Sequence, residues 1–233
     1  MRALQPRKTV VLSLAILALL LASPSFSRAS LVYSIDDGTH ENSIGLTAGG
    51  DLIWLNRLTT DPANNLITTI SVAFGSTVNG RQVTVAIWQD NDGPNGVPTH
   101  AVLLNTASGV VANQNSDTFN DYSITPTLIT GATFLVGIEI HGQAAGEFPA
   151  NLDTDNPHHQ SFVAGGAAGT GNLADLGANQ IPVLSEDSIV PGNFMVRATG
   201  VPAAAVPEPA SLALLGIGGL GLLSYRGWRR RQA

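Results

Sequence analysis

Residues 133–140 read Thr-Phe-Leu-Val-Gly-Ile-Glu-Ile, with Phe134, Val136, Ile138 and Ile140 at alternate positions. Side chains of a β-strand point to opposite faces in turn, so this period of two predicts a strand with one apolar face. The alternation recurs in residues 66–74, 83–88 and 194–198, between turns rich in Asn, Asp, Gly and Pro. We therefore predict an all-β domain over residues 30–200, an antiparallel β-sandwich or jelly roll.

Two finer predictions concern single segments of this domain. In residues 66–74 the alternation places Leu66, Ile70, Val72 and Phe74 on one face, toward the core. Residues 165–177 (GGAAGTGNLADLG) are dominated by small and turn-forming residues, and are predicted to form a mobile surface loop.

Composition excludes several classes of function. The chain of 233 residues has no cysteine, which rules out disulfides, thiolate metal sites and a cysteine nucleophile. Residues 30–202 contain three arginines and no lysine against sixteen acidic residues. Because such an acidic body repels phosphate backbones, we expect no nucleic-acid partner.

The N-terminal residues 1–29 have the pattern of a secretory signal peptide. Basic residues precede the twelve-residue apolar run 10–21, and Ser27 and Ala29 supply small side chains before the predicted cleavage point. The run is short of the roughly 20 residues that span a bilayer. We expect a signal helix that is removed after Ala29.

The C-terminal end combines three features in order. Residues 201–205 read as a linker, and Pro207, Glu208 and Pro209 follow it. The apolar run 212–223 is then predicted to form a short transmembrane helix. It is followed by a basic group that would stop the chain at the inner membrane: Arg226, Arg229, Arg230 and Arg231.

This arrangement over residues 206–233 resembles the PEP-CTERM sorting signal of exported bacterial proteins. The resemblance implies an exosortase-type processing enzyme as a partner, and an inner-membrane intermediate. It further implies a final place at the cell surface or in the extracellular matrix of a Gram-negative bacterium. The resemblance indicates a sorting route, and it does not indicate what the domain of residues 30–200 does.

For the body we expect a non-enzymatic binding or structural role, linked to extracellular polysaccharide or to adhesion. A secreted hydrolase acting on polysaccharide is the first alternative, although Glu139 and Glu147 look like ordinary surface acids and no hydrolase motif occurs. A purely structural surface protein is the second. No cofactor is expected, and calcium is the one ion for which the sequence offers candidate ligands.

Two local patterns suggest ligands. Asp90 and Asp92 stand at alternate positions before Gly93, as oxygen ligands do in calcium loops, but a turn after the strand 83–88 explains the same residues. Trp88 ends that strand beside the acidic turn, and is the best candidate for stacking on a sugar ring, with core packing as the alternative. Trp54, Tyr33 and Tyr122 are weaker candidates.

Overall fold

The alternating segments form the predicted strands, and all of their pairings are antiparallel. The computed structural model describes residues 29–203. In chain order its strands are β1 (Leu31–Tyr33), β2 (Asn42–Ile44), β3 (Gly50–Thr59), β4 (Leu66–Val72), β5 (Phe74–Ser76), β6 (Gln82–Gln89), β7 (Val102–Val110), β8 (Asn120–Leu128), β9 (Thr133–Gln143), β10 (Phe148–Asp153), β11 (Ser161–Gly166), β12 (Ile181–Ser185), β13 (Asn193–Phe194) and β14 (Val196–Val201). The helical elements of the described residues are two short 3-10 turns, η1 (Leu176–Ala178) and η2 (Glu186–Ser188).

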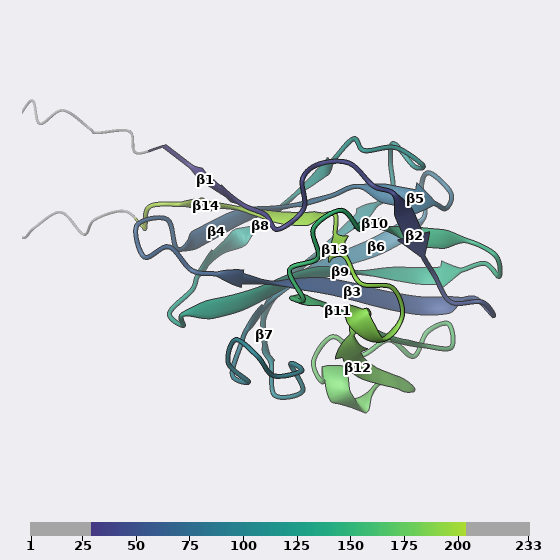
Figure 1. Ribbon diagram of the computed structural model, residues 1–233. Coiled ribbons are helices and arrows are strands. Elements are labelled where there is room, and N and C mark those ends of the chain that lie inside the picture. The colour runs from purple at the N-terminus through teal and green to yellow at the C-terminus, as the bar shows by residue number, and fades with distance from the viewer. Residues whose placement is uncertain (1–28, 204–233) are drawn as a thin grey trace, which may run out of the picture.

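The strands form two facing layers (Figure 1). One layer is a six-stranded sheet in the order β12-β11-β3-β9-β6-β7. The other joins the four-stranded sheet β1-β14-β4-β8 to a smaller sheet, β13-β10-β2, in which β5 also pairs with β10. Only Ala73 separates β4 from β5, and only Met195 separates β13 from β14. The second layer is therefore one surface that bends at these two residues.

The space between the layers holds the main core. Its largest side chains are fully buried: Trp54, Phe74, Phe134 and Phe194. Trp54 and Phe74 meet edge to face, with ring centroids 6.2 Å apart. The even-numbered residues 134–140 of β9 all point into this core, as the alternation predicts.

A second apolar cluster lies on the outer face of the six-stranded sheet. Ile53, Leu55, Trp88 and Leu135 project from its central strands, and Leu176 covers them from η1. The centre of this sheet is therefore buried on both faces. Consecutive apolar residues such as 52–55 (LIWL) are typical of strands covered on both sides.

Two finer predictions about the chain are wrong. The pairing of β4 with β8 shifts register between Ile67 and Thr69, so Ile67 is fully buried while Leu66 is only half-buried. A β-bulge of this kind moves the residues before it to the opposite face. The segment 165–177 is also more than a surface loop, because Gly165 and Gly166 belong to β11 and are buried.

The two ends of the described chain leave the sandwich together. Leu31 of β1 pairs with Gly200 of β14, so the first strand begins where the last strand ends (Figure 1). We name this end the proximal pole. At the opposite end, the distal pole, β3 begins at Gly50 and β9 ends at Gln143.

No helix within residues 29–203 is long and apolar enough to cross a membrane. The predicted signal helix and the predicted C-terminal transmembrane helix both lie outside the described residues.

Candidate functional site

A group of three potential metal ligands lies near the distal pole, on the outer face of the six-stranded sheet. Glu139 and His141 are odd-numbered residues of β9, and therefore point away from the main core. Asp51 stands at the start of β3, where the pairing with β9 shifts register between Gly50 and Leu52. Two strands that are far apart in the sequence thus bring the three side chains together.

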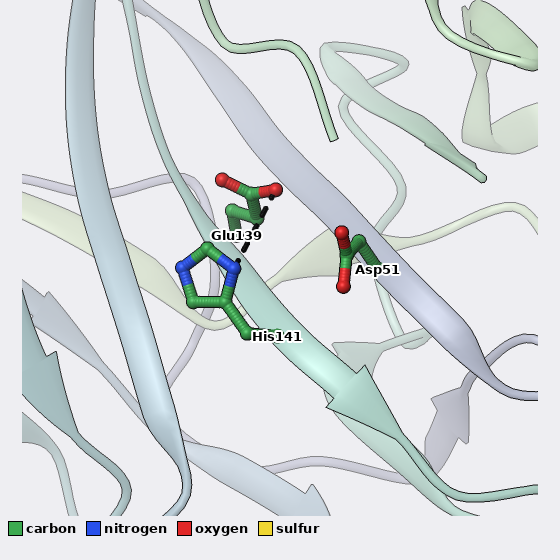
Figure 2. A group of neighbouring side chains, drawn as sticks. All are labelled: Asp51, Glu139 and His141. Carbon is green, nitrogen blue, oxygen red and sulfur yellow. Dashed lines mark ion pairs between the residues drawn. The ribbon is translucent and has the colours of Figure 1, made fainter. Parts of the chain in front are cut away.

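The three side chains converge (Figure 2). One ligand atom from each lies within 4.8 Å of the others. His141 Nδ1 is 3.8 Å from Glu139 Oε1, which is too long for a hydrogen bond. Asp51 and Glu139 are only 1% and 5% exposed, whereas the side chain of His141 is 40% exposed. The group is therefore buried on the carboxylate side and reached from solvent past the imidazole.

Asp51 is fixed by backbone N–H groups. Its Oδ1 accepts a hydrogen bond from Gly142 N at 2.8 Å. Its Oδ2 accepts from Gly169 N at 2.6 Å and from Gly171 N at 3.1 Å. The two bonds to Oδ2 hold residues 169–171, which follow β11, against the sheet. We name this segment the cover, because it lies over the site.

Glu139 differs, because no hydrogen bond reaches its carboxylate from the described residues. Burial raises the pKa of Glu139, the neighbouring His141 opposes this shift, and the neighbouring Asp51 adds to it. A Cβ atom at Gly171 would overlap Glu139 Oε1, so a larger residue at this position would push the carboxylate aside. The expectation that Glu139 is an ordinary surface acid is wrong.

Thr84 orients the imidazole of His141. Its Oγ1 lies 2.9 Å from His141 Nε2. Thr84 sits directly opposite Glu139 in the pairing of β6 with β9. When Nε2–H donates to Thr84, Nδ1 presents its lone pair toward Glu139. The site then offers one nitrogen and two carboxylates, which is a ligand set for a divalent cation.

The structure gives Asp90 and Asp92 protein partners. Asp90 Oδ2 accepts from Arg57 Nε at 2.8 Å and from Thr133 Oγ1 at 2.6 Å, in an ion pair whose side chains are at most 2% exposed. Asp92 accepts from the backbone N of His100 at 2.8 Å, and lies 2.7 Å from its Nδ1. The geometry favours the turn over the calcium loop.

Of the two interpretations of Trp88, the structure confirms core packing and contradicts stacking on a sugar. Its side chain is fully buried in the outer cluster, and Nε1 donates to Leu173 O at 2.7 Å. Trp54, Tyr33 and Tyr122 are also buried. Among the described residues, none of these four candidates offers an open ring face to a ligand.

From the sequence, Glu139 was interpreted only as a surface acid, and neither His141 nor Asp51 was singled out; the hardest of the three to find is Asp51. The signal for it was weak: a single acid after Gly49 and Gly50, directly before the apolar run 52–55. Its pairing with the end of β9 spans about ninety residues of sequence, and no local pattern predicts that register.

The sorting signal lies outside the described residues, but comparison with known families identifies it. The family model of the PEP-CTERM protein-sorting motif matches residues 205–231. This chain carries a PEP-CTERM protein-sorting motif. The match includes Pro207, Glu208 and Pro209, and ends at Arg231. The PEP-CTERM motif marks an exported protein that an exosortase-type enzyme processes at the membrane.

Comparisons over the rest of the chain add little to the PEP-CTERM match. No curated protein sequence matches the chain. The clostridial cysteine protease Cwp84, after propeptide cleavage, is 14% identical with a TM-score of 0.48, over 75% of this chain and 40% of that one.

A second structure contains the cysteine protease and lectin-like domains of Cwp84, a surface layer associated protein of Clostridium difficile. It is 14% identical with a TM-score of 0.42, over 66% of this chain and 33% of that one. The chain thus spans less than half the length of either structure, and neither match says anything about its ligand or activity.

Proposed function

We propose that this protein is a non-enzymatic β-sandwich of the cell surface or extracellular matrix of a Gram-negative bacterium, and that it binds extracellular polysaccharide there. One observation carries the proposal. The PEP-CTERM motif begins at residue 205, four residues after β14 ends at Val201. The sorting signal therefore follows the last strand almost directly in the sequence, and the whole sandwich is the domain that the signal sorts.

The position of the chain ends supports a surface role. β1 and β14 meet at the proximal pole, so both junctions to the terminal segments lie on one side of the domain (Figure 1). A C-terminal anchor in the membrane would hold the proximal pole near the lipid. The distal pole and the two outer faces would then point toward whatever surrounds the cell.

The outer face of the four-stranded sheet supports contact with a polymer. Ala198, Ile70 and Tyr122 form an inward row, so the neighbouring row Thr199, Thr69 and Ser123 points outward. These small hydroxyl side chains lie side by side across three strands. Hydroxyl groups both donate and accept hydrogen bonds, which suits a polymer made of sugar hydroxyls.

The state of the acidic side chains supports binding over catalysis. Glycoside hydrolysis needs one carboxyl group free to give a proton and another free to act on the sugar or on water. Glu147 is instead paired with Arg81 at 2.8 Å, and accepts from Ala144 N at 2.8 Å. Asp51, beside Glu139, is held in place by three backbone N–H groups.

Retention on immobilised matrix polysaccharide tests the proposal. Residues 30–202 hold every described strand and should be retained, and Thr69→Glu should weaken retention because a charge enters the hydroxyl row. Thr106→Glu is the matched control, since Thr106 is exposed on β7 of the other sheet. Absence of retention on every matrix polymer would contradict the proposal.

A reducing-sugar assay on the same polymers separates a binder from a hydrolase. A binder releases no sugar ends, whereas release that Glu139→Gln abolishes would establish the hydrolase. A protein inert in both assays would be the purely structural alternative.

A further inference from the structure

We propose that Asp51, Glu139 and His141 bind one divalent transition-metal ion, with Zn²⁺ as the best match, on the outer face of the six-stranded sheet near the distal pole. The proposal goes beyond the sorting role and does not depend on polysaccharide binding. It rests on the convergence of the three side chains and on the lack of a hydrogen-bond donor to the buried Glu139 carboxylate within residues 29–203.

The ligand set selects the class of ion. An imidazole nitrogen suits Zn²⁺ and its neighbours in the transition series, whereas Ca²⁺ and Mg²⁺ prefer oxygen ligands alone. Bonds of about 2.1 Å place the ligands of a tetrahedral zinc ion roughly 3.4 Å apart. The 3.8 Å between His141 Nδ1 and Glu139 Oε1 is close to this spacing. The three ligand atoms lie within 4.8 Å of one another, so movements of at most about 1.4 Å would bring them to the spacing of zinc ligands.

The carboxylate of Glu139, which has only His141 as an ion-pair neighbour at 3.8 Å within the described residues, is the second, independent observation. This residue is 5% exposed, and within residues 29–203 nothing donates a hydrogen bond to its carboxylate. Buried carboxylates normally have hydrogen-bond donors, because removing them from water is costly. Figure 2 shows the carboxylate beside the imidazole, and Asp51 facing both from β3. A cation held between the three would supply the missing partner.

The surrounding contacts have the form of an outer coordination shell. Metal-bound histidines usually use their second ring nitrogen in a hydrogen bond that fixes the tautomer, and Thr84 stands at that place. The three N–H groups on Asp51 likewise orient a ligating carboxylate. Three protein ligands leave a fourth position open, on the side where His141 meets solvent.

The rival account is a simple ion pair between a protonated His141 and Glu139, without a metal. The two accounts differ in an observable way, because the ion pair predicts no saturable binding of Zn²⁺ at this place. They also differ at Thr84, whose hydroxyl matters for metal affinity only when the imidazole is a ligand.

The test is calorimetric titration of the full chain, purified in detergent and stripped of metal with a chelator, using Zn²⁺ alone. We expect one equivalent to bind. Glu139→Gln and His141→Gln should each abolish that event, and Thr84→Val should weaken it by roughly 10- to 100-fold. Cobalt substitution should give visible absorption bands that the Glu139→Gln protein lacks.

His159→Gln is the matched control. His159 is an exposed histidine that lies 2.9 Å from the carboxylate of Asp187, so it resembles His141 in type but not in setting. It should leave zinc binding unchanged. The proposal would be overturned by absence of one-to-one binding, or by binding that survives both Glu139→Gln and His141→Gln.

Discussion

Glu186 predicts an unusual dependence of stability on pH. It is fully buried at the start of η2, and neither carboxyl oxygen has a hydrogen-bond partner within the described chain. Burial raises the pKa of Glu186 to about 8, and the neighbouring Asp187 adds to the shift. The nearby Val190 backbone N–H opposes the shift in the pKa of Glu186 more weakly. The folded protein therefore holds this carboxyl group in its neutral form at neutral pH.

The sign and size of the effect follow from proton linkage. In the unfolded chain the carboxyl group has its ordinary pKa of 4.5, so between pH 4.5 and about 8 only the folded state keeps the proton. Stability then falls as pH rises, by about 1.4 kcal/mol per unit for one such group. Between about pH 5 and pH 7.5 the loss amounts to about 3 kcal/mol.

Glu186→Gln removes this titration and keeps the shape of the side chain. We expect the variant to gain about 3 kcal/mol over the natural chain between about pH 5 and pH 7.5, with no further change below pH 4.5. Urea unfolding at several pH values, followed by the fluorescence of the buried tryptophans, measures the difference. A difference that stays constant with pH would refute the reasoning, because it would mean that Glu186 is charged in the folded state.

Two substitutions test the buried ion pairs, and added calcium tests the acidic turn. Arg57→Ala should destabilise the sandwich by about 3–5 kcal/mol in urea unfolding, because it leaves the buried Asp90 carboxylate without its cationic partner. A loss of stability below about 1 kcal/mol would contradict this. Arg197→Ala should cost about 3 kcal/mol by the same measurement, since Asp36 is buried and its carboxylate accepts from Arg197 Nε at 3.0 Å. Calcium at millimolar concentration should leave the melting temperature unchanged, and a rise that Asp92→Ala abolishes would restore the calcium loop.

The strands were predictable because their signal is local. Alternation in 83–88 and 133–140 identified β6 and β9, and the inward residues of β9 are the predicted ones. The period of two shows which residues of a strand share a face. It does not show whether other parts of the chain bury that face. Trp88 shows the consequence, because the segment that buries it lies around Leu173, far along the chain.

The candidate site was harder to predict for the same reason. Glu139 and His141 share a face of one strand, which the sequence shows. Their contact with Asp51 depends on the register between β3 and β9 and on the register shift between Gly50 and Leu52. The residues around Gly50 do not predict that shift. The close approach of Gly171 to the Glu139 carboxylate likewise depends on the fold of a segment about thirty residues further along the chain.

Mass spectrometry of the mature protein, combined with fractionation of the cells that make it, tests the central claim most directly. We predict an envelope or extracellular protein that begins at Ser30 and has been processed near Pro207-Glu208-Pro209. The intact chain of 233 residues in the cytosolic fraction would contradict the account.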